Sequence, residues 1–198
     1  MLTTGRDPSD IFAPVRKRWT RAEYEALSSI ELLSQQRLEL VEGDVIDKMG
    51  KGRRHANALG LLYEWLLSIF GKQRVLPESP IDVSPEDNTT SEPQPDLVVF
   101  SRDYAHFAEQ NPGPGDLLLV LEIADSSLYL DMTIKSGLYA RAGIADYWVL
   151  DIAGRRMIVF RDPRDGRYES ILAYAADEDV APLAAPESLL QVGDIFPQ

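Results

Sequence analysis

The chain has 198 residues, 44% of them hydrophobic, which is enough for one domain with a sizeable core. Its net charge of −12 argues against broad, non-specific adhesion to nucleic acid, although it leaves room for a local basic groove. The absence of cysteine excludes disulfides and thiolate zinc sites. No window approaches the roughly 20 apolar residues of a membrane helix, and the start has no signal-peptide core, so we expect a soluble cytoplasmic protein.

The N-terminal part of the chain is predicted to be an arm followed by a short helix. Residues 1–18 have no hydrophobic periodicity and carry a basic patch, so we expect an arm there and a single domain over 19–198. Thr20 followed by Glu23 is a capping-box pattern, which predicts a helix over 22–27.

The next segments predict two strands, a long helix and another strand. Residues 38–46 are typical of a strand, a turn at Gly43 and a returning strand. Residues 55–70 place their apolar side chains on one helical face, and Gly71 ends this helix. A further strand is expected over 75–83.

The central segment contains two short apolar runs. Residues 97–100 and 117–123 predict buried strands. A helix is expected over 131–142 with Gly143 as its C-terminal stop, and residues 147–150 predict the next strand.

The C-terminal segment is expected to add a β-hairpin to the sheet. Residues 156–160 and 168–174 predict its two strands, and 189–196 predict a short closing strand or a packed tail. Together these elements favour an α/β (α+β) fold in which helices flank a mixed β-sheet.

Two acidic residues belong to the central apolar runs. Asp96 opens the first run and Glu122 lies inside the second. A charged carboxylate in a buried strand costs roughly several kcal/mol unless a cation or hydrogen-bond donors compensate. Two such acids on successive strands, followed by Lys135 on the predicted helix, indicate a site for a divalent metal beside a water.

Several of these segments, in this order, resemble a known family. The chain is similar to the Uma-type restriction-endonuclease-like proteins of the PD-(D/E)XK nuclease superfamily over roughly residues 19–196. The resemblance implies a restriction-endonuclease-like core and an endonuclease that hydrolyses phosphodiester bonds, above all of DNA. The segments that carry it are Glu39-Leu-Val-Glu42-Gly43, Pro95-Asp96-Leu-Val-Val, Leu121-Glu122-Ile, Asp131-x-x-x-Lys135 and Leu138 to Asp151.

Phosphodiester hydrolysis needs an activated water, charge stabilisation in the transition state and a stabilised leaving oxygen. One or two Mg²⁺ or Mn²⁺ ions can supply all three, and such hard cations prefer oxygen ligands. Asp96 and Glu122 are the predicted direct ligands, with the carbonyl oxygen of Ile123 as a third. Glu42 is the candidate for a further ligand or for orienting water. Lys135 would orient the nucleophile or stabilise charge.

The position of the lysine departs from the superfamily pattern. That pattern places a lysine two residues after the glutamate, where this chain has Ala124. Lys135 follows Glu122 by 13 residues (135 − 122), at a position where the Uma-type proteins also have a lysine. A helix that leaves the end of a strand can turn its first turns back across the site.

Each candidate also has an ordinary structural interpretation. Asp96 after a proline could be a turn or cap residue. Glu122 could lie on an edge strand or form a structural ion pair with Lys135, which could equally be a surface lysine. Glu42 before a glycine could be a hairpin-turn residue.

A basic stretch lies near the predicted site. It could grip a phosphate backbone or be a solvated loop, and the sequence favours neither. No helix-turn-helix pattern indicates base-specific recognition. The candidate phosphate contacts are Lys48, Lys51, Arg53, Arg54 and His55.

The sequence also permits two other functions and predicts an oligomeric state. The chain could be a non-catalytic member of the same fold that binds nucleic acid or protein, or it could hydrolyse another phosphoester. The added strands over 147–174 leave an exposed sheet edge, so we also expect a homodimer.

Overall fold

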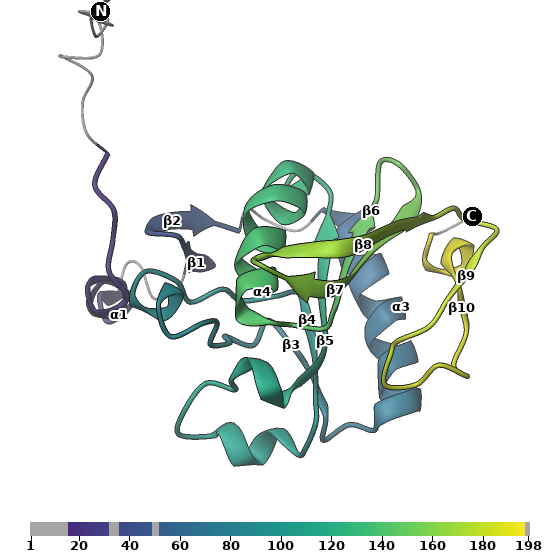
Figure 1. Cartoon of the computed structure of the whole chain (residues 1–198), viewed down its shortest axis with the longest axis horizontal. Helices are drawn as coiled ribbons and strands as arrows, with labels where there is room; N and C mark the ends of the chain where they lie inside the picture. The colour runs from purple at the N-terminus through teal and green to yellow at the C-terminus, as the bar shows by residue number, and fades with distance from the viewer. Residues whose placement is uncertain (1–15, 32–35, 49–51, 197–198) are drawn as a thin grey trace, which may run out of the picture.

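The computed structural model describes residues 16–31, 36–48 and 52–196, and its centre is a six-stranded mixed sheet (Figure 1). The strand order is β3-β4-β5-β6-β7-β8, and every neighbouring pair is antiparallel except β5 and β6, which are parallel. The strands are β3 (Val75–Pro77), β4 (Leu97–Phe100), β5 (Leu117–Ala124), β6 (Asp146–Asp151), β7 (Arg156–Arg164) and β8 (Arg167–Tyr174).

Helices cover both faces of this sheet. Helix α3 (Arg53–Phe70) lies on one face and ends at Gly71, which has a φ of +80°. The crossover between the parallel strands lies on the other face, where a π-helix, η5 (Leu130–Lys135), continues directly into α4 (Ser136–Ala142) (Figure 1).

The alternation of side chains along the strands divides the core into two layers. Leu97 and Leu121 pack in the layer beneath α3, together with Leu62 of that helix. Their strand neighbours Val98 and Val120 pack in the other layer. The sheet is therefore buried on both faces, which explains why its central strands have continuous rather than alternating apolar sequences.

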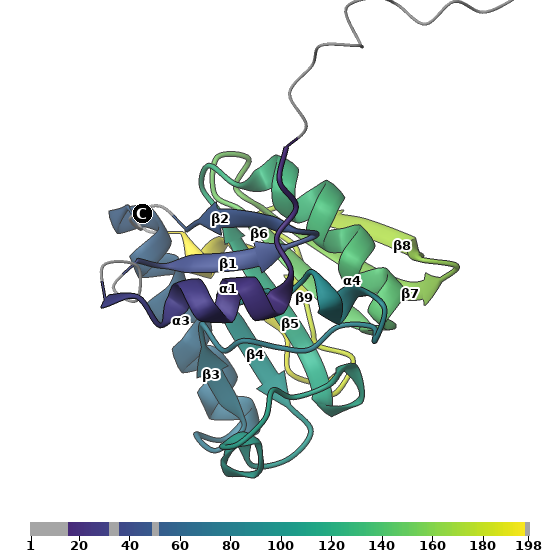
Figure 2. The same ribbon diagram turned by 90° about the vertical axis from the view of Figure 1, so that its left-hand side faces the viewer.

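A smaller unit lies beside the α4 face. It consists of α1 (Arg21–Ser28) and the antiparallel pair β1 (Leu38–Val41) and β2 (Asp44–Asp47) (Figure 2). The backbone N–H groups of Leu40 and Glu92 each donate to the carbonyl of the other, at 3.4 and 2.8 Å. These bonds attach β1 to the segment before β4.

Short elements complete the fold. A two-stranded sheet and a 3₁₀-helix follow β8 and close the C-terminal region, and the described residues form three further 3₁₀-helices in loops. These elements are β9 (Asp179–Val180), β10 (Leu190–Gln191), η6 (Val192–Ile195), η2 (Asp87–Thr89), η3 (Tyr104–Phe107) and η4 (Pro114–Asp116). None of the helices in the described ranges is long and apolar enough to cross a membrane.

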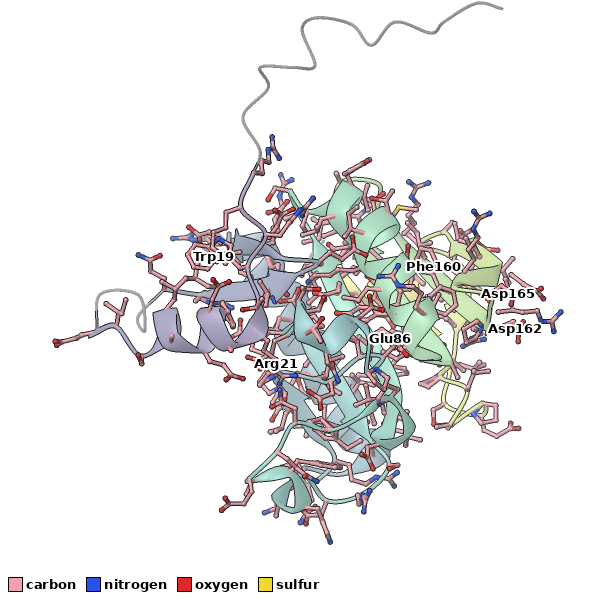
Figure 3. All side chains as sticks on the ribbon, turned by 60° about the vertical axis from the view of Figure 1, so that its left-hand side comes forward. Trp19, Arg21, Glu86, Phe160, Asp162 and Asp165 are labelled. Carbon is pink, nitrogen blue, oxygen red and sulfur yellow. The ribbon has the colours of Figure 1, made fainter. Side chains whose placement is uncertain are left out.

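The predicted fold class is confirmed, and several element bounds differ from prediction. Strand β7, expected over 156–160, continues to Arg164. The strand expected over 75–83 ends at Pro77, because this residue and Pro80 have no N–H for a ladder and Glu78 has a φ of +53°. The helix expected over 131–142 begins as a π-helix. The β7–β8 hairpin is present, and Asp162 and Asp165 project from its tip (Figure 3).

Candidate active site

The register of β4 and β5 places Asp96 beside Glu122. Leu97 pairs with Leu121 in an antiparallel register. Asp96, just before Leu97, therefore lies opposite Glu122, just after Leu121. The backbone N–H of Asp96 donates to Glu122 Oε2 at 3.3 Å. The N–H of Ile123 donates to Asp96 Oδ2 at 2.9 Å. Both acids are buried, and their carboxylates are held in place by the backbone of the opposite strand.

Lys135 reaches these acids from the last residue of the π-helix. Its Nζ lies 2.8 Å from Glu122 Oε1, 2.8 Å from Glu39 Oε1 and 3.9 Å from Asp131 Oδ1. The Lys135 side chain is only 1% exposed. Burial acts to lower the pKa of Lys135, but the surrounding carboxylates, Glu122 first, raise it above its ordinary value. The lysine is therefore a permanent cation in this site.

The environment of Glu122 favours its neutral form more than water does. Burial raises the pKa of Glu122 to about 7, although the positive charge of Lys135 opposes this shift. The hydroxyl of Tyr139 also donates to Glu122 Oε1, at 3.2 Å. Burial likewise raises the pKa of Asp131, whose Oδ2 accepts a 2.6 Å hydrogen bond from the Ser127 hydroxyl.

Two basic side chains approach Asp96 from the opposite direction. His55, in the first turn of α3, places Nε2 at 3.1 Å from Asp96 Oδ2. Lys48 Nζ lies 3.5 Å from Asp96 Oδ1 and donates to the carbonyl of Gln94. Asp96 therefore has a hydrogen-bonding imidazole on one carboxylate oxygen and an ammonium group beside the other.

These charged groups face a cavity of about 330 Å³. The walls of this cavity are formed by the β1–β2 hairpin, the start of α3, the start of β4, the end of β5 and the segment that leads into the π-helix. Asp96, Glu122, Lys135, Lys48 and His55 all line it. The structure thus brings together five of the residues that the sequence singled out.

Glu42, the candidate for a further metal ligand or for orienting water, is not among the residues that line this cavity. It has a φ of +48° in the β1–β2 turn, and its Oε1 accepts a 2.6 Å hydrogen bond from Arg141. Glu39 of the same hairpin lines the cavity instead. It lies within β1 and is buried, whereas Glu42 lies past the end of that strand. The signal was present in the sequence: Glu39 is also an acid inside an apolar run.

The other predicted residues are distributed around this site. Ile123 lines the cavity. Arg53 and Arg54 are exposed and do not line it, so the expectation of phosphate contacts in this cavity does not extend to them. Lys51 lies outside the described residues.

The donor chemistry of the site can be compared with the needs of a divalent metal. Within the described ranges, no group of three or more His, Asp or Glu side chains is arranged to hold a metal ion. Asp96 and Glu122 nevertheless present two adjacent carboxylates to the cavity. Mg²⁺ is commonly bound by one or two carboxylates and several waters, so these two residues fit Mg²⁺ in donor type.

The fold and site define a restriction-endonuclease-like protein with a carboxylate–lysine site. The chain belongs to the Uma2 family, described as "Putative restriction endonuclease", whose model matches residues 21–192. This confirms the resemblance of the sequence and supports a nuclease function. A comparison with curated proteins found no match.

A solved structure with the same fold is a crystal structure of a putative nuclease belonging to DUF820 from Anabaena variabilis ATCC 29413. The TM-score is 0.68 and the sequence identity is 20%, and the similarity covers 92% of this chain and 98% of the other. At this identity the likeness shows a shared fold.

Proposed function

We propose that this protein is a metal-dependent endonuclease that hydrolyses phosphodiester bonds, most favourably those of DNA. The observation that carries the proposal is the convergence of Asp96, Glu122 and Lys135 on one cavity. Two carboxylates for a hard cation and a permanent positive charge are the groups that phosphoryl transfer requires. Membership of the Uma2 family supports the nuclease part of the proposal.

Asp96 and Glu122, with the carbonyl oxygen of Ile123, would hold Mg²⁺ or Mn²⁺. When bound, such an ion supplies Lewis acidity and lowers the pKa of a coordinated water. Because the pKa of Glu122 is about 7, loss of its proton at neutral pH costs little, and the charged ligand is available.

Lys135 would act as an electrostatic group and not as a base. Its raised pKa keeps the ammonium protonated at neutral pH, so it cannot accept a proton from water. Its charge can instead stabilise the negative oxygens of the phosphate in the transition state. His55 is a positioning residue, because it acts on the site through its contact with Asp96.

A homodimer remains part of the proposal. β8 is an edge strand of the sheet, and its Ile171 and Leu172 are each 54% exposed. Edges of this kind are commonly covered by pairing, and two copies would bring two sites to a duplex. Light scattering at micromolar concentration should give the mass of two chains, and a monomer there would contradict this assembly.

One observation favours a second candidate, a non-catalytic binding protein of the same fold. Lys135 Nζ is 2.8 Å from a carboxylate oxygen of both Glu39 and Glu122, so the site also forms a closed ion-pair network. Such a network can be purely structural.

The deciding experiment incubates the purified protein with plasmid DNA, single-stranded DNA and RNA, with Mn²⁺ and with chelator. We expect cleavage that needs the metal and that Asp96→Asn and Glu122→Gln each abolish, because an amide holds a cation less well than a carboxylate. Glu42→Gln is the matched control, since it makes the same change outside the cavity, and it should retain cleavage. Metal binding without cleavage of any substrate would favour the binding protein or another phosphoester.

A further inference from the structure

A second cavity, of about 320 Å³, lies on the other side of the first turn of α3. Gly52 and His55 line the first cavity, whereas Arg54 and Ala58 line the second. The residues that follow two neighbouring strands are likewise divided between the two cavities. Asp125, after β5, lines the first cavity and Ile152, after β6, lines the second. The two cavities are therefore neighbours that share the start of α3.

The second cavity combines positive charge with an apolar floor. Ala58, Ile152, Ile195 and Phe196 contribute the apolar surface, and Arg54 and Arg155 contribute the charge. The guanidinium of Arg155 lies over the Phe196 ring, 4.7 Å from its centroid. This contact holds a planar cation against the floor of the cavity.

Both arginines of the second cavity lack an acidic partner among the residues that the structure describes. Arg54 and Arg155 form no ion pair with a carboxylate of the described residues, whereas other arginines of this acidic chain do, such as Arg141 and Arg161. The first turn of α3 also contains no acidic residue, so the positive end of the helix dipole adds to the same region. A chain with a net charge of −12 has thus kept a local positive site beside the proposed catalytic cavity.

We propose that this second cavity binds one unpaired nucleotide of the substrate strand. Arg54 and Arg155 hold its phosphate, and the apolar floor receives its base. Bases stack on guanidinium planes, and Arg155, which lies over the buried Phe196 ring, presents such a plane to the cavity. The inference rests on the proposed function, which it deepens by naming the form of the substrate.

The size of the cavity decides between a single strand and a duplex. A volume of about 320 Å³ is at the lower end of the roughly 300–1,000 Å³ of small-ligand sites. One nucleotide fits such a space, but a base pair with its two backbones does not. A strand that crosses the start of α3 would therefore have one nucleotide in this cavity and a neighbouring phosphate at the first.

The test measures binding of a fluorescein-labelled 12-nucleotide single-stranded DNA by anisotropy in chelator, where no cleavage occurs. We expect Arg54→Ala and Arg155→Ala each to weaken binding about 5- to 10-fold and to lower the salt dependence by about one unit. Arg155→Lys should cause a smaller loss, because it keeps the charge but not the planar group. The effect on a blunt duplex of the same sequence should be smaller.

Lys72→Ala is the matched control. Lys72 is exposed in the loop after α3, lines neither cavity and forms no ion pair with a described carboxylate, so its removal changes the net charge equally. It should bind the single strand like the wild type. The inference is overturned if the double variant Arg54→Ala/Arg155→Ala, folded by circular dichroism, binds no more weakly than this control, or if the wild type does not bind the strand.

A cleavage assay with Mn²⁺ separates this inference from the proposed function. The double variant should raise KM for a single-stranded substrate and leave kcat unchanged, because the cavity contacts the strand away from the reacting phosphate. Cleavage with an unchanged KM would contradict the proposed binding of a nucleotide in the second cavity and leave the nuclease function supported. Arginine-dependent binding without any cleavage would support the cavity and contradict the nuclease.

Discussion

Buried carboxylates occur in two regions of this protein, and their surroundings differ. Asp96 and Glu122 lie at the cavity around Lys135. Asp146 and Asp151, on β6, are equally buried but line neither cavity. Burial alone therefore does not identify a functional acid.

The donors around the β6 acids show what a structural carboxylate needs. Asp146 accepts hydrogen bonds from the Trp148 indole, the Arg161 guanidinium and the backbone of Leu183, at 2.8, 2.9 and 2.8 Å. Arg156 likewise pairs with Asp151 at 2.9 Å. Each of these acids has its own arginine, whereas Glu39, Glu122 and Asp131 surround a single lysine at a cavity. The excess of carboxylates over cations distinguishes the site from the structural pairs.

Removal of the shared lysine should have the largest effect. Lys135→Ala leaves Glu39 and Glu122 buried without their cation, so unfolding in denaturant should show a loss of roughly 3–5 kcal/mol. Cleavage per folded molecule should fall about 100- to 1,000-fold, a typical result of losing one preorganised electrostatic group.

Lys17→Ala is the control for that variant, because Lys17 forms an exposed pair with Glu23 at 2.7 Å. Its removal should leave the free energy of unfolding close to that of the wild type, because water and salt screen an exposed pair. If Lys135→Ala lost stability but kept its cleavage rate, the lysine would be structural and the distinction between the two regions would fail.

A smaller, purely structural effect is expected on β6. Asp146→Asn replaces an acceptor of three hydrogen bonds by an amide, which leaves Arg161 and a neighbouring donor imperfectly paired. Thermal or denaturant unfolding should show a loss of about 1–3 kcal/mol. Cleavage per folded molecule should match that of the wild type. A loss of cleavage without a matching loss of folded protein would instead assign Asp146 a role in the active site.

The smallest effect concerns pH. The pKa of Glu122 is about 7 in the folded protein against an ordinary value of 4.5, so between these values the folded state binds more protons than the unfolded chain. The free energy of unfolding of the metal-free protein should therefore fall as the pH rises from about 4.5 to 7. Glu122→Gln should flatten this part of the curve, and an unchanged slope in that variant would assign the dependence to another group.

Local sequence signals predicted most of the secondary structure and part of the site. The capping box of Thr20 and Glu23 begins α1, and Gly71 and Gly143 end α3 and α4, because these signals act within one turn of helix. The improbability of an acid inside a buried strand was enough to single out Asp96 and Glu122. Their roles in hydrolysis stay predictions.

Contacts between distant segments decided the rest. Whether Glu39 or Glu42 reaches Lys135 depends on where the β1–β2 hairpin packs, and both are acids within the same five residues of sequence. The second cavity joins the start of α3 to the β6–β7 turn and the C-terminal Phe196, which no local pattern connects. The sequence by itself determined most of the elements and singled out Asp96 and Glu122, since these follow from local propensity and the cost of desolvation. Only the tertiary structure decided which charges meet, because that is set by long-range packing.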